Sequence, residues 1–179
     1  MGGRHELSTP RLVLEPVTPE HADEAWPHLD DARMWEFFPH LRPGSLQDLR
    51  RLYERWAAGY QESDAAQVWE NWLCRRRDNG RLAGGAQSTL LPLSRTAYLA
   101  YGIYVEQQRR GFAQETMTAV IAHAREAHQI QTFFVEVHVR NVASFRLAEA
   151  LGFERIESAQ RADQGDETNE NEFLYRLVL

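Results

Sequence analysis

One junction in the sequence constrains the fold more than any other, because it sets a strand, a tight turn and a helix in that order. The segment 96–105 is apolar and aromatic, and it predicts a strand that is buried on both faces. Gln108-Arg109-Arg110-Gly111-Phe112-Ala113 follows shortly after it. From Gly111 onward, apolar residues recur at the spacing of one helical face. We therefore expect a strand that runs through a turn into a helix opened by Gly111.

The patterns on either side of this junction predict a single mixed α/β domain over residues 1–179, with a flexible N-terminus over 1–8. Thr18 and Ser45 are expected as N-caps of two helices, and Asp78-Asn79-Gly80 as a hairpin turn. The predicted order is β-α-α-β-β-β-α-β-α-β-β. Besides the junction, the expected elements are strands at 11–17, 68–76, 82–91, 132–139, 153–159 and 172–179, helices at 18–29, 46–60 and 142–151, and a polar loop at 160–171.

Composition narrows the classes of function. The net charge of −6 argues against a nucleic-acid-binding protein, which usually presents a basic surface. No apolar run reaches the roughly 20 residues that span a bilayer, and the first residues lack the apolar segment of a signal peptide. Cys74 is the single cysteine, so an intrachain disulfide is impossible and a thiolate metal site is not expected. We expect a cytoplasmic protein with no nucleic-acid partner, no membrane partner and no metal.

The turn at 108–113 has the properties of an anion site. A helix N-terminus presents unpaired backbone N–H groups and the positive end of the helix dipole, and a pyrophosphate suits both. Gly111 and Ala113 let the backbone approach phosphates closely, while Arg109 and Arg110 add positive charge. The spacing fits neither G-x-G-x-x-G nor a Walker A loop. The residues alone leave a second interpretation open, a plain strand-to-helix turn with solvated arginines.

The turn resembles the acetyl-CoA-binding signature of the GNAT superfamily of N-acetyltransferases, Gln/Arg-x-x-Gly-x-Gly/Ala, at Gln108, Gly111 and Ala113. Three further segments are similar to elements of that family, and most of all to its RimJ/RimL-like branch of ribosomal-protein N-terminal acetyltransferases. They are Thr9-Pro10-Arg11-Leu12-Val13-Leu14, Asn141-Val142-Ala143-Ser144 and Leu151-Gly152-Phe153. The resemblance therefore covers nearly the whole chain.

The resemblance implies the GNAT fold, with a mostly antiparallel central sheet whose fourth and fifth strands are parallel and splay apart where acetyl-CoA enters. It implies that the pantetheine bonds to the fourth strand and that the pyrophosphate lies on the turn. Asn141 is implied to contact the pantetheine or to orient its loop. The cofactor-binding residues implied in this way are Ile103, Val105, Gln108, Arg109, Arg110, Gly111, Phe112, Ala113 and Asn141.

For catalysis, the resemblance implies direct attack of a neutral amine on the thioester, so the amine must lose a proton and the thiolate must gain one. Glu136 is the expected general base, with His138, on the same strand face, as the reserve. Many relatives carry a tyrosine general acid four residues before the glycine of L-G-F, where this chain has Ala148. Ser144 is the expected replacement.

The expected acceptor is a primary amine, either a protein N-terminus or a small molecule. Aromatic residues at 35–38 and 69–72 are expected to line an acceptor cleft. Two alternatives remain open: an acyl-CoA-binding regulatory module of the same fold without catalysis, and an unrelated α/β protein with a chance turn. A homodimer is compatible with the sequence.

Overall fold

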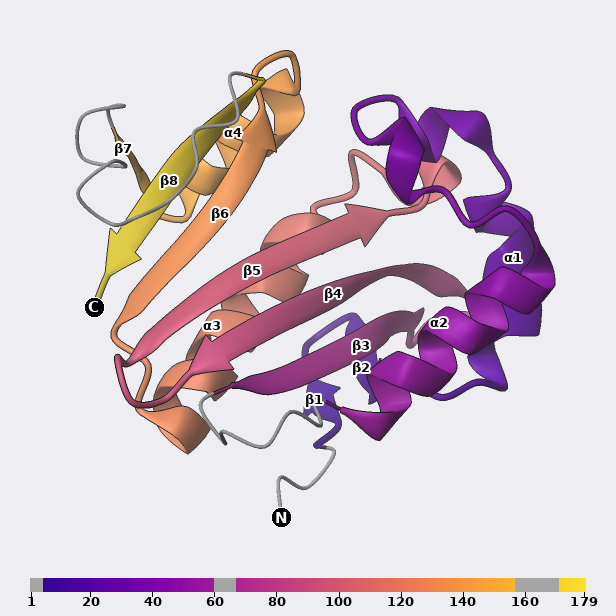
Figure 1. The fold of residues 1–179 in the computed structure, drawn as a ribbon, viewed down its shortest axis with the longest axis horizontal. Helices are drawn as coiled ribbons and strands as arrows, with labels where there is room; N and C mark the ends of the chain where they lie inside the picture. The colour runs from indigo at the N-terminus through magenta and orange to yellow at the C-terminus, as the bar shows by residue number, and fades with distance from the viewer. Residues whose placement is uncertain (1–4, 60–66, 157–170) are drawn as a thin grey trace.

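The computed structural model describes residues 5–59, 67–156 and 171–179. Its centre is one mixed sheet in the order β1-β2-β3-β4-β5-β6-β8-β7, in which β5 and β6 are parallel and the other neighbours antiparallel (Figure 1). The strands are β1 (Leu7–Ser8), β2 (Leu12–Pro16), β3 (Val68–Arg76), β4 (Leu82–Leu91), β5 (Thr96–Ile103), β6 (Thr132–His138), β7 (Glu154–Ile156) and β8 (Glu172–Val178).

The helices follow the predicted order. They are α1 (His21–Leu29), α2 (Leu46–Ala58), α3 (Phe112–His128) and α4 (Val142–Ala150). Short 3-10 helices lie at Ala32–Trp35, Pro39–Leu41 and Val105–Gln107. The added element is β1, so the fourth and fifth expected strands are β5 and β6. The second half of the segment expected to be flexible is held in place: Leu7 and Ser8 pair with β2, and the carbonyl of His5 accepts a bond from the Trp72 indole, while residues 1–4 lie outside the described residues.

The two parallel strands separate partway along their length. β5 pairs with β6 only from Thr96 to Leu99, opposite Thr132 to Val135. Beyond Leu99, β5 continues to Ile103 beside β4 alone, while β6 continues beside β8. In Figure 1 the ribbons of β5 and β6 diverge toward the top of the view. The sheet therefore has the splay that the resemblance implies.

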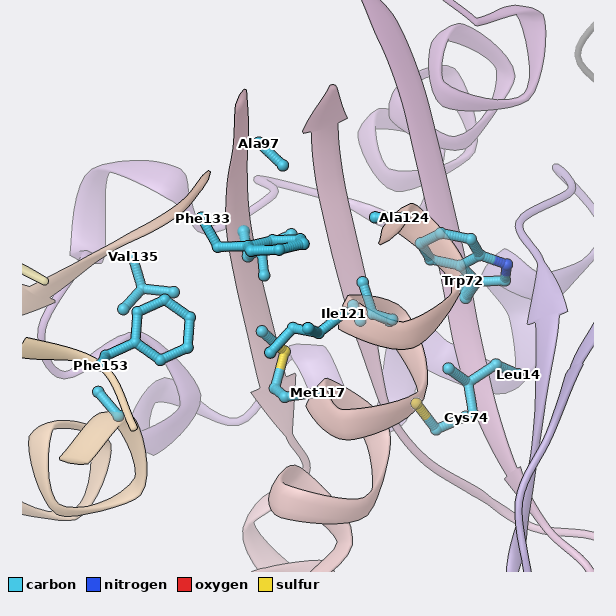
Figure 2. Packing of buried hydrophobic residues seen from close by; sticks show 14 of the residues in the cluster. Leu14, Trp72, Cys74, Ala97, Met117, Ile121, Ala124, Phe133, Val135 and Phe153 are labelled. Carbon is cyan, nitrogen blue, oxygen red and sulfur yellow. The ribbon is translucent and has the colours of Figure 1, made fainter. Parts of the chain in front are cut away.

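The main core lies between α3 and one face of the sheet. In Figure 2, Met117 and Ile121 of α3 point toward Phe133 of β6, with Trp72 and Cys74 of β3 on the other side of the helix. A second cluster packs α1 and α2 on the opposite face. It includes Ala25, Leu49, Tyr53, Leu73 and Leu82. The neighbours Leu73 and Cys74 belong to different clusters because successive strand residues point to opposite faces.

The expectation that β5 is buried on both faces is wrong. Ala97 and Leu99 are buried toward α3, whereas Tyr98, on the opposite face, is 38% exposed. The second cluster draws on β3, the start of β4 and Tyr104, so α1 and α2 leave the outer face of β5 uncovered at Tyr98. That open face becomes important for the candidate site.

Of the two helix N-caps predicted from the sequence, one is confirmed and one is wrong. Ser45 caps α2 as expected, because its Oγ accepts the Asp48 backbone N–H at 3.1 Å. The Thr18 cap is wrong, since α1 begins at His21 with Glu20 as N-cap.

The end of the 153–159 strand and most of the 160–171 loop lie outside the described residues. Within the described ranges, every helix is too short or too polar to cross a membrane.

Candidate active site

The turn after β5 leaves three backbone donors without an intrahelical acceptor. Gly111 is the N-cap of α3 and has φ +78°, a left-handed conformation that glycine adopts without strain. The first intrahelical bond runs from the Glu115 N–H to the Gly111 carbonyl at 3.1 Å. The N–H groups of Phe112, Ala113 and Gln114 therefore point out of the helix end, where its dipole is positive. This geometry can bind a phosphate group.

The side chains of the turn point in different directions: two arginines face solvent, whereas Gln108 and Phe112 face the protein. Arg109 and Arg110 are exposed, and Arg109 also has a positive φ of 61°. Gln108 folds back, and its Nε2 donates to the Ile103 carbonyl at 3.0 Å. Phe112 is buried in the core, 5% exposed, so only its backbone can face a ligand. Gln108 and Phe112 thus shape the turn with their side chains.

The turn is held by residues near the N-terminus. The carboxylate of Glu115 accepts bonds from the Thr9 hydroxyl (2.6 Å), the Arg11 backbone N–H (2.7 Å) and the Arg11 Nε (2.6 Å). Arg11 Nη1 donates to the Arg110 carbonyl at 2.8 Å, inside the turn itself. Burial acts to raise the pKa of Glu115, but these bonds outweigh it and lower the pKa. The T-x-R opening of the sequence is therefore a clamp on the turn.

The free edge of β5 lies next to this turn. The Tyr104 N–H bonds to Ala83 of the β4 side at 2.9 Å, so by alternation the backbone groups of Tyr101 and Ile103 face the splay. The Ile103 carbonyl is taken by Gln108. Val105, expected on the strand, instead lies in a 3-10 helix, where its carbonyl accepts the Gln108 N–H at 3.4 Å. The strand edge available for β-type pairing is thus 101–103.

Glu136 and His138 lie on β6 beyond the last pair with β5. Both point to the face opposite α3, since Val135 before Glu136 and Val137 after it are in the α3 core. Glu136 is exposed. The His138 ring lies 5.3 Å from Phe37 and 6.1 Å from Phe38. The Arg140 backbone N–H donates to His138 Nδ1 at 3.2 Å.

The opposite flank of the splay carries a pair of hydroxyl groups. The Tyr101 phenol donates to Ser144 Oγ at 3.0 Å, which joins β5 to the first turn of α4. Asn141 caps that helix through its side-chain oxygen, which accepts the Ser144 N–H at 3.1 Å. Burial raises the pKa of Tyr101, with a smaller opposite effect of the Ser144 bond, so the phenol keeps its proton at neutral pH. Ala148, at the position of the usual tyrosine, is buried in the core.

Tyr101 was not expected as a site residue. It lies in the junction strand, and alternation along that strand predicts only that it faces α3. The hydroxyl partner is 43 residues away, on α4. A hydroxyl pair that joins one strand and one distant helix in this way has no local sequence signal.

The residues expected to line one aromatic cleft lie on two different faces of the sheet, and the cavity on the outer face is lined by other residues. Phe37 and Phe38 reach His138 on the face opposite α3. Trp72, by contrast, is 3% exposed and belongs to the core beneath α3, because it alternates with residues on the outer face. On the outer face the described residues form an open cavity of about 370 Å³, in which Tyr98 stacks on Phe134 at 5.3 Å. Arg176 and Thr132 also line it.

Cys74 takes no part in the site. It is fully buried, and its Sγ lies 3.4 Å from the Thr116 hydroxyl. Burial raises the pKa of the thiol to about 12. A thiol that stays protonated in the core is a poor nucleophile.

Comparisons with known proteins identify the fold and the family to which these features correspond. A family profile described as an acetyltransferase (GNAT) domain matches residues 11–154. The curated Bacillus subtilis (strain 168) protein named "Uncharacterized N-acetyltransferase YoaA" is 27% identical over 150 residues, which cover 83% of this chain and 82% of YoaA.

Two solved structures share the fold at low sequence identity. RimL, a ribosomal L7/L12 alpha-N-protein acetyltransferase in complex with coenzyme A, has a TM-score of 0.77 and 16% identity over 98% of both chains. The microcin C7 self-immunity acetyltransferase MccE, in complex with acetyl-CoA and AMP, has a TM-score of 0.76 and 15% identity, covering 96% of this chain and 94% of MccE.

The clamp predicts a pH-dependent contribution to stability. The folded-state pKa of Glu115 is lowered, so its contribution is present above the unfolded-state value and is lost as pH falls through the folded-state value. We expect Glu115→Gln to lower the free energy of unfolding by about 1.5–3 kcal/mol at pH 7, because charge-assisted bonds are lost. Urea unfolding at pH 7 and at pH values below 4 measures both effects.

Glu126→Gln is the matched control, because Glu126 is an exposed carboxylate of the same helix. It should change stability by less than about 0.5 kcal/mol. Equal effects of the two substitutions at pH 7, or a Glu115→Gln deficit that persists unchanged in acid, would contradict the clamp.

Proposed function

We propose that this chain, which belongs to the GNAT family of acetyltransferases, transfers the acetyl group of acetyl-CoA to a primary amine. The acceptor is the N-terminus of a protein or a small-molecule amine. The observation that carries the proposal is the coincidence, at one splayed pair of strands, of an open helix N-terminus and a partly buried hydroxyl pair. In this proposal the splay admits acetyl-CoA between the strands, the helix N-terminus binds its pyrophosphate, and the hydroxyl pair donates the proton.

The residues fit acetyl-CoA as cosubstrate. The N–H groups of Phe112, Ala113 and Gln114 would hold the pyrophosphate, with Arg109 and Arg110 exposed beside them. The edge of β5 at 101–103 would pair with the pantetheine amides in the manner of an added strand. The RimL structure contains coenzyme A and the MccE structure acetyl-CoA, which supports the same cosubstrate here.

Glu136 is the proposed general base. It is exposed on the outer face of the splay, where an amine can reach it, and a carboxylate can take a proton directly or through water. His138 is less suited, because its Nδ1 lone pair already accepts the Arg140 N–H. In the neutral ring Nε2 then carries the hydrogen and has no lone pair to offer the amine.

Tyr101 and Ser144 together are the proposed general acid. As the amine nitrogen bonds to the carbonyl carbon and the carbon–sulfur bond breaks, the departing thiolate needs a proton or a hydrogen-bond donor. The Ser144 hydroxyl, which accepts from Tyr101, can donate its own proton onward, and the phenol can replace that proton. Asn141 positions Ser144 by capping α4.

The acceptor would approach from the outer face. Tyr98, Phe37 and Phe38 present aromatic surface there. Tyr98 stacks on the buried Phe134, which lies two residues before Glu136 on β6. RimL is an acetyltransferase of ribosomal L7/L12 alpha-amino groups, which supports a protein N-terminus as one acceptor. Residues of the splay favour neither acceptor class over the other, so the assay must present both.

The test is release of free thiol from acetyl-CoA with a panel of amines, including peptides with free N-termini, followed by mass spectrometry of the product. We expect acetylation of at least one amine by the wild-type chain. Gln114→Asp should weaken acetyl-CoA binding about tenfold, because it adds negative charge at the phosphate site. It should keep or raise stability, because an acidic residue suits the first turn of a helix.

Thr118→Asp is the matched control, because it adds the same charge one turn further along the exposed face of α3. It should bind acetyl-CoA much as the wild type does. Tight binding with no turnover on any amine would favour the non-catalytic module, and the absence of binding would contradict the proposal altogether.

Glu136→Gln should retain acetyl-CoA affinity and reduce turnover by roughly 10²–10⁴-fold at neutral pH, the usual cost of losing a general base. The deficit should shrink at high pH, where the free amine loses its proton unaided. A pH–rate profile of kcat with the acceptor found above measures this. An unchanged rate at neutral pH would remove Glu136 from the mechanism and redirect attention to a bound water.

Tyr101→Phe and Ser144→Ala should each lower kcat, and the double variant should lose little more than the worse single variant. That non-additivity follows if the two hydroxyls act as one relay. Acetyl-CoA affinity should change little, since neither hydroxyl is part of the phosphate site. Losses that simply multiply would show two independent roles and would contradict the relay.

A further inference from the structure

A carboxylate and two imidazoles converge at the C-terminal end of α3, at the other end of the helix from the phosphate turn. Glu70 comes from β3, His123 from the last turns of α3 and His128 is its final residue. His123 Nε2 lies 3.1 Å from both Glu70 oxygens, and His128 Nε2 lies 3.2 Å from Glu70 Oε1. One ligand atom from each residue lies within 4.8 Å of the other two.

The three side chains are withdrawn from solvent and held by rigid elements. Their exposed fractions are 13% for Glu70, 10% for His123 and 18% for His128. The Trp72 ring packs edge-on against His123 at 5.7 Å. A site of this kind needs little reorganisation to bind a ligand, because a central strand and a 17-residue helix already position its groups.

One buried polar group beside these three side chains has no hydrogen-bond partner among the described residues. Ser88 pairs in register with Glu70 across β3 and β4, on the same face of the sheet. Its hydroxyl is buried and has no hydrogen-bond partner among the described residues. An orphaned hydroxyl beside a carboxylate and two imidazoles is an independent sign of a polar occupant.

The spacing matches tetrahedral coordination. Zinc binds imidazole nitrogen and carboxylate oxygen at about 2.0–2.2 Å, so adjacent ligand atoms of a tetrahedral site lie about 3.3–3.5 Å apart. The nitrogen–oxygen distances of 3.1 and 3.2 Å are close to that edge length. Two imidazoles and one carboxylate are also a ligand set that zinc uses.

We propose that Glu70, His123 and His128 bind one divalent transition-metal ion of the zinc class. The ion fastens the end of α3 to β3. Water or His5, whose ring lies 6.1 Å from that of His123, completes the coordination. The single cysteine led to the expectation of no metal. These ligands lie 53 and 58 positions apart, on a strand and a helix, and form no spacing motif in the sequence.

The test uses the full-length chain without a polyhistidine tag, treated with a chelator and then titrated with Zn²⁺ in a calorimeter. We expect one equivalent to bind and to raise Tm, since an ion that binds only the folded state stabilises it. Co²⁺ should give the intense visible bands of a tetrahedral site. His123→Asn and Glu70→Gln should each weaken Zn²⁺ binding by more than about tenfold.

His21→Asn is the matched control, because His21 pairs with Glu15 at 3.2 Å but has no second imidazole in that pair. It should bind Zn²⁺ as the wild type does. His128→Asn provides a third ligand variant, and circular dichroism of every variant verifies that the fold is retained. No saturable binding by the wild type, or equal binding by folded His123→Asn and Glu70→Gln, would overturn the proposal and leave an ion-pair network.

Discussion

The structure depends on the point where β5 and β6 stop pairing, after Leu99 and Val135. Backbone groups that leave a ladder need other partners, because buried unpaired N–H and C=O groups are costly. On their outer edges β6 keeps its pairing with β8 and β5 keeps its pairing with β4, and on the splayed side the Ile103 carbonyl accepts a bond from Gln108. What remains is an open strand edge beside a helix N-terminus. The phosphate turn, the Tyr101–Ser144 pair and Glu136 all border this opening, and each has its proposed role because of it.

Much of the fold could be predicted because its signals are local. The hairpin at Asp78-Asn79-Gly80, the Ser45 cap and the helix opened by Gly111 each depend on a few adjacent residues, and all are confirmed. The same reasoning failed where the burial of a strand depends on an element far away in the sequence. Burial of β5 on both faces depends on how far α1 and α2 extend, and the strand's own apolar residues carry no information on that.

The candidate site likewise has one part with a local sequence signal and other parts without one. The turn could be found from Gln108, Gly111 and Ala113, because a phosphate site built from backbone groups needs particular residues in sequence. Tyr101 with Ser144, and Glu70 with the two histidines, join residues from separate elements. Only packing brings such groups together, so no spacing rule finds them. Val105 shows the opposite error, since the apolar pattern continues through it after the strand has already turned into a 3-10 helix.

The link between Arg11 and Glu115 also has a consequence for how the protein is made. The two residues are 104 positions apart, and the ribosome adds about 5–20 residues per second. Arg11 therefore emerges roughly 5–20 s before its partner exists. During that interval the segment from Thr9 to Arg11 has no helix to hold, so the turn after β5 acquires its shape late in synthesis. A shortened chain beginning just after Arg11 would keep every proposed phosphate donor and lose the brace that holds them in place.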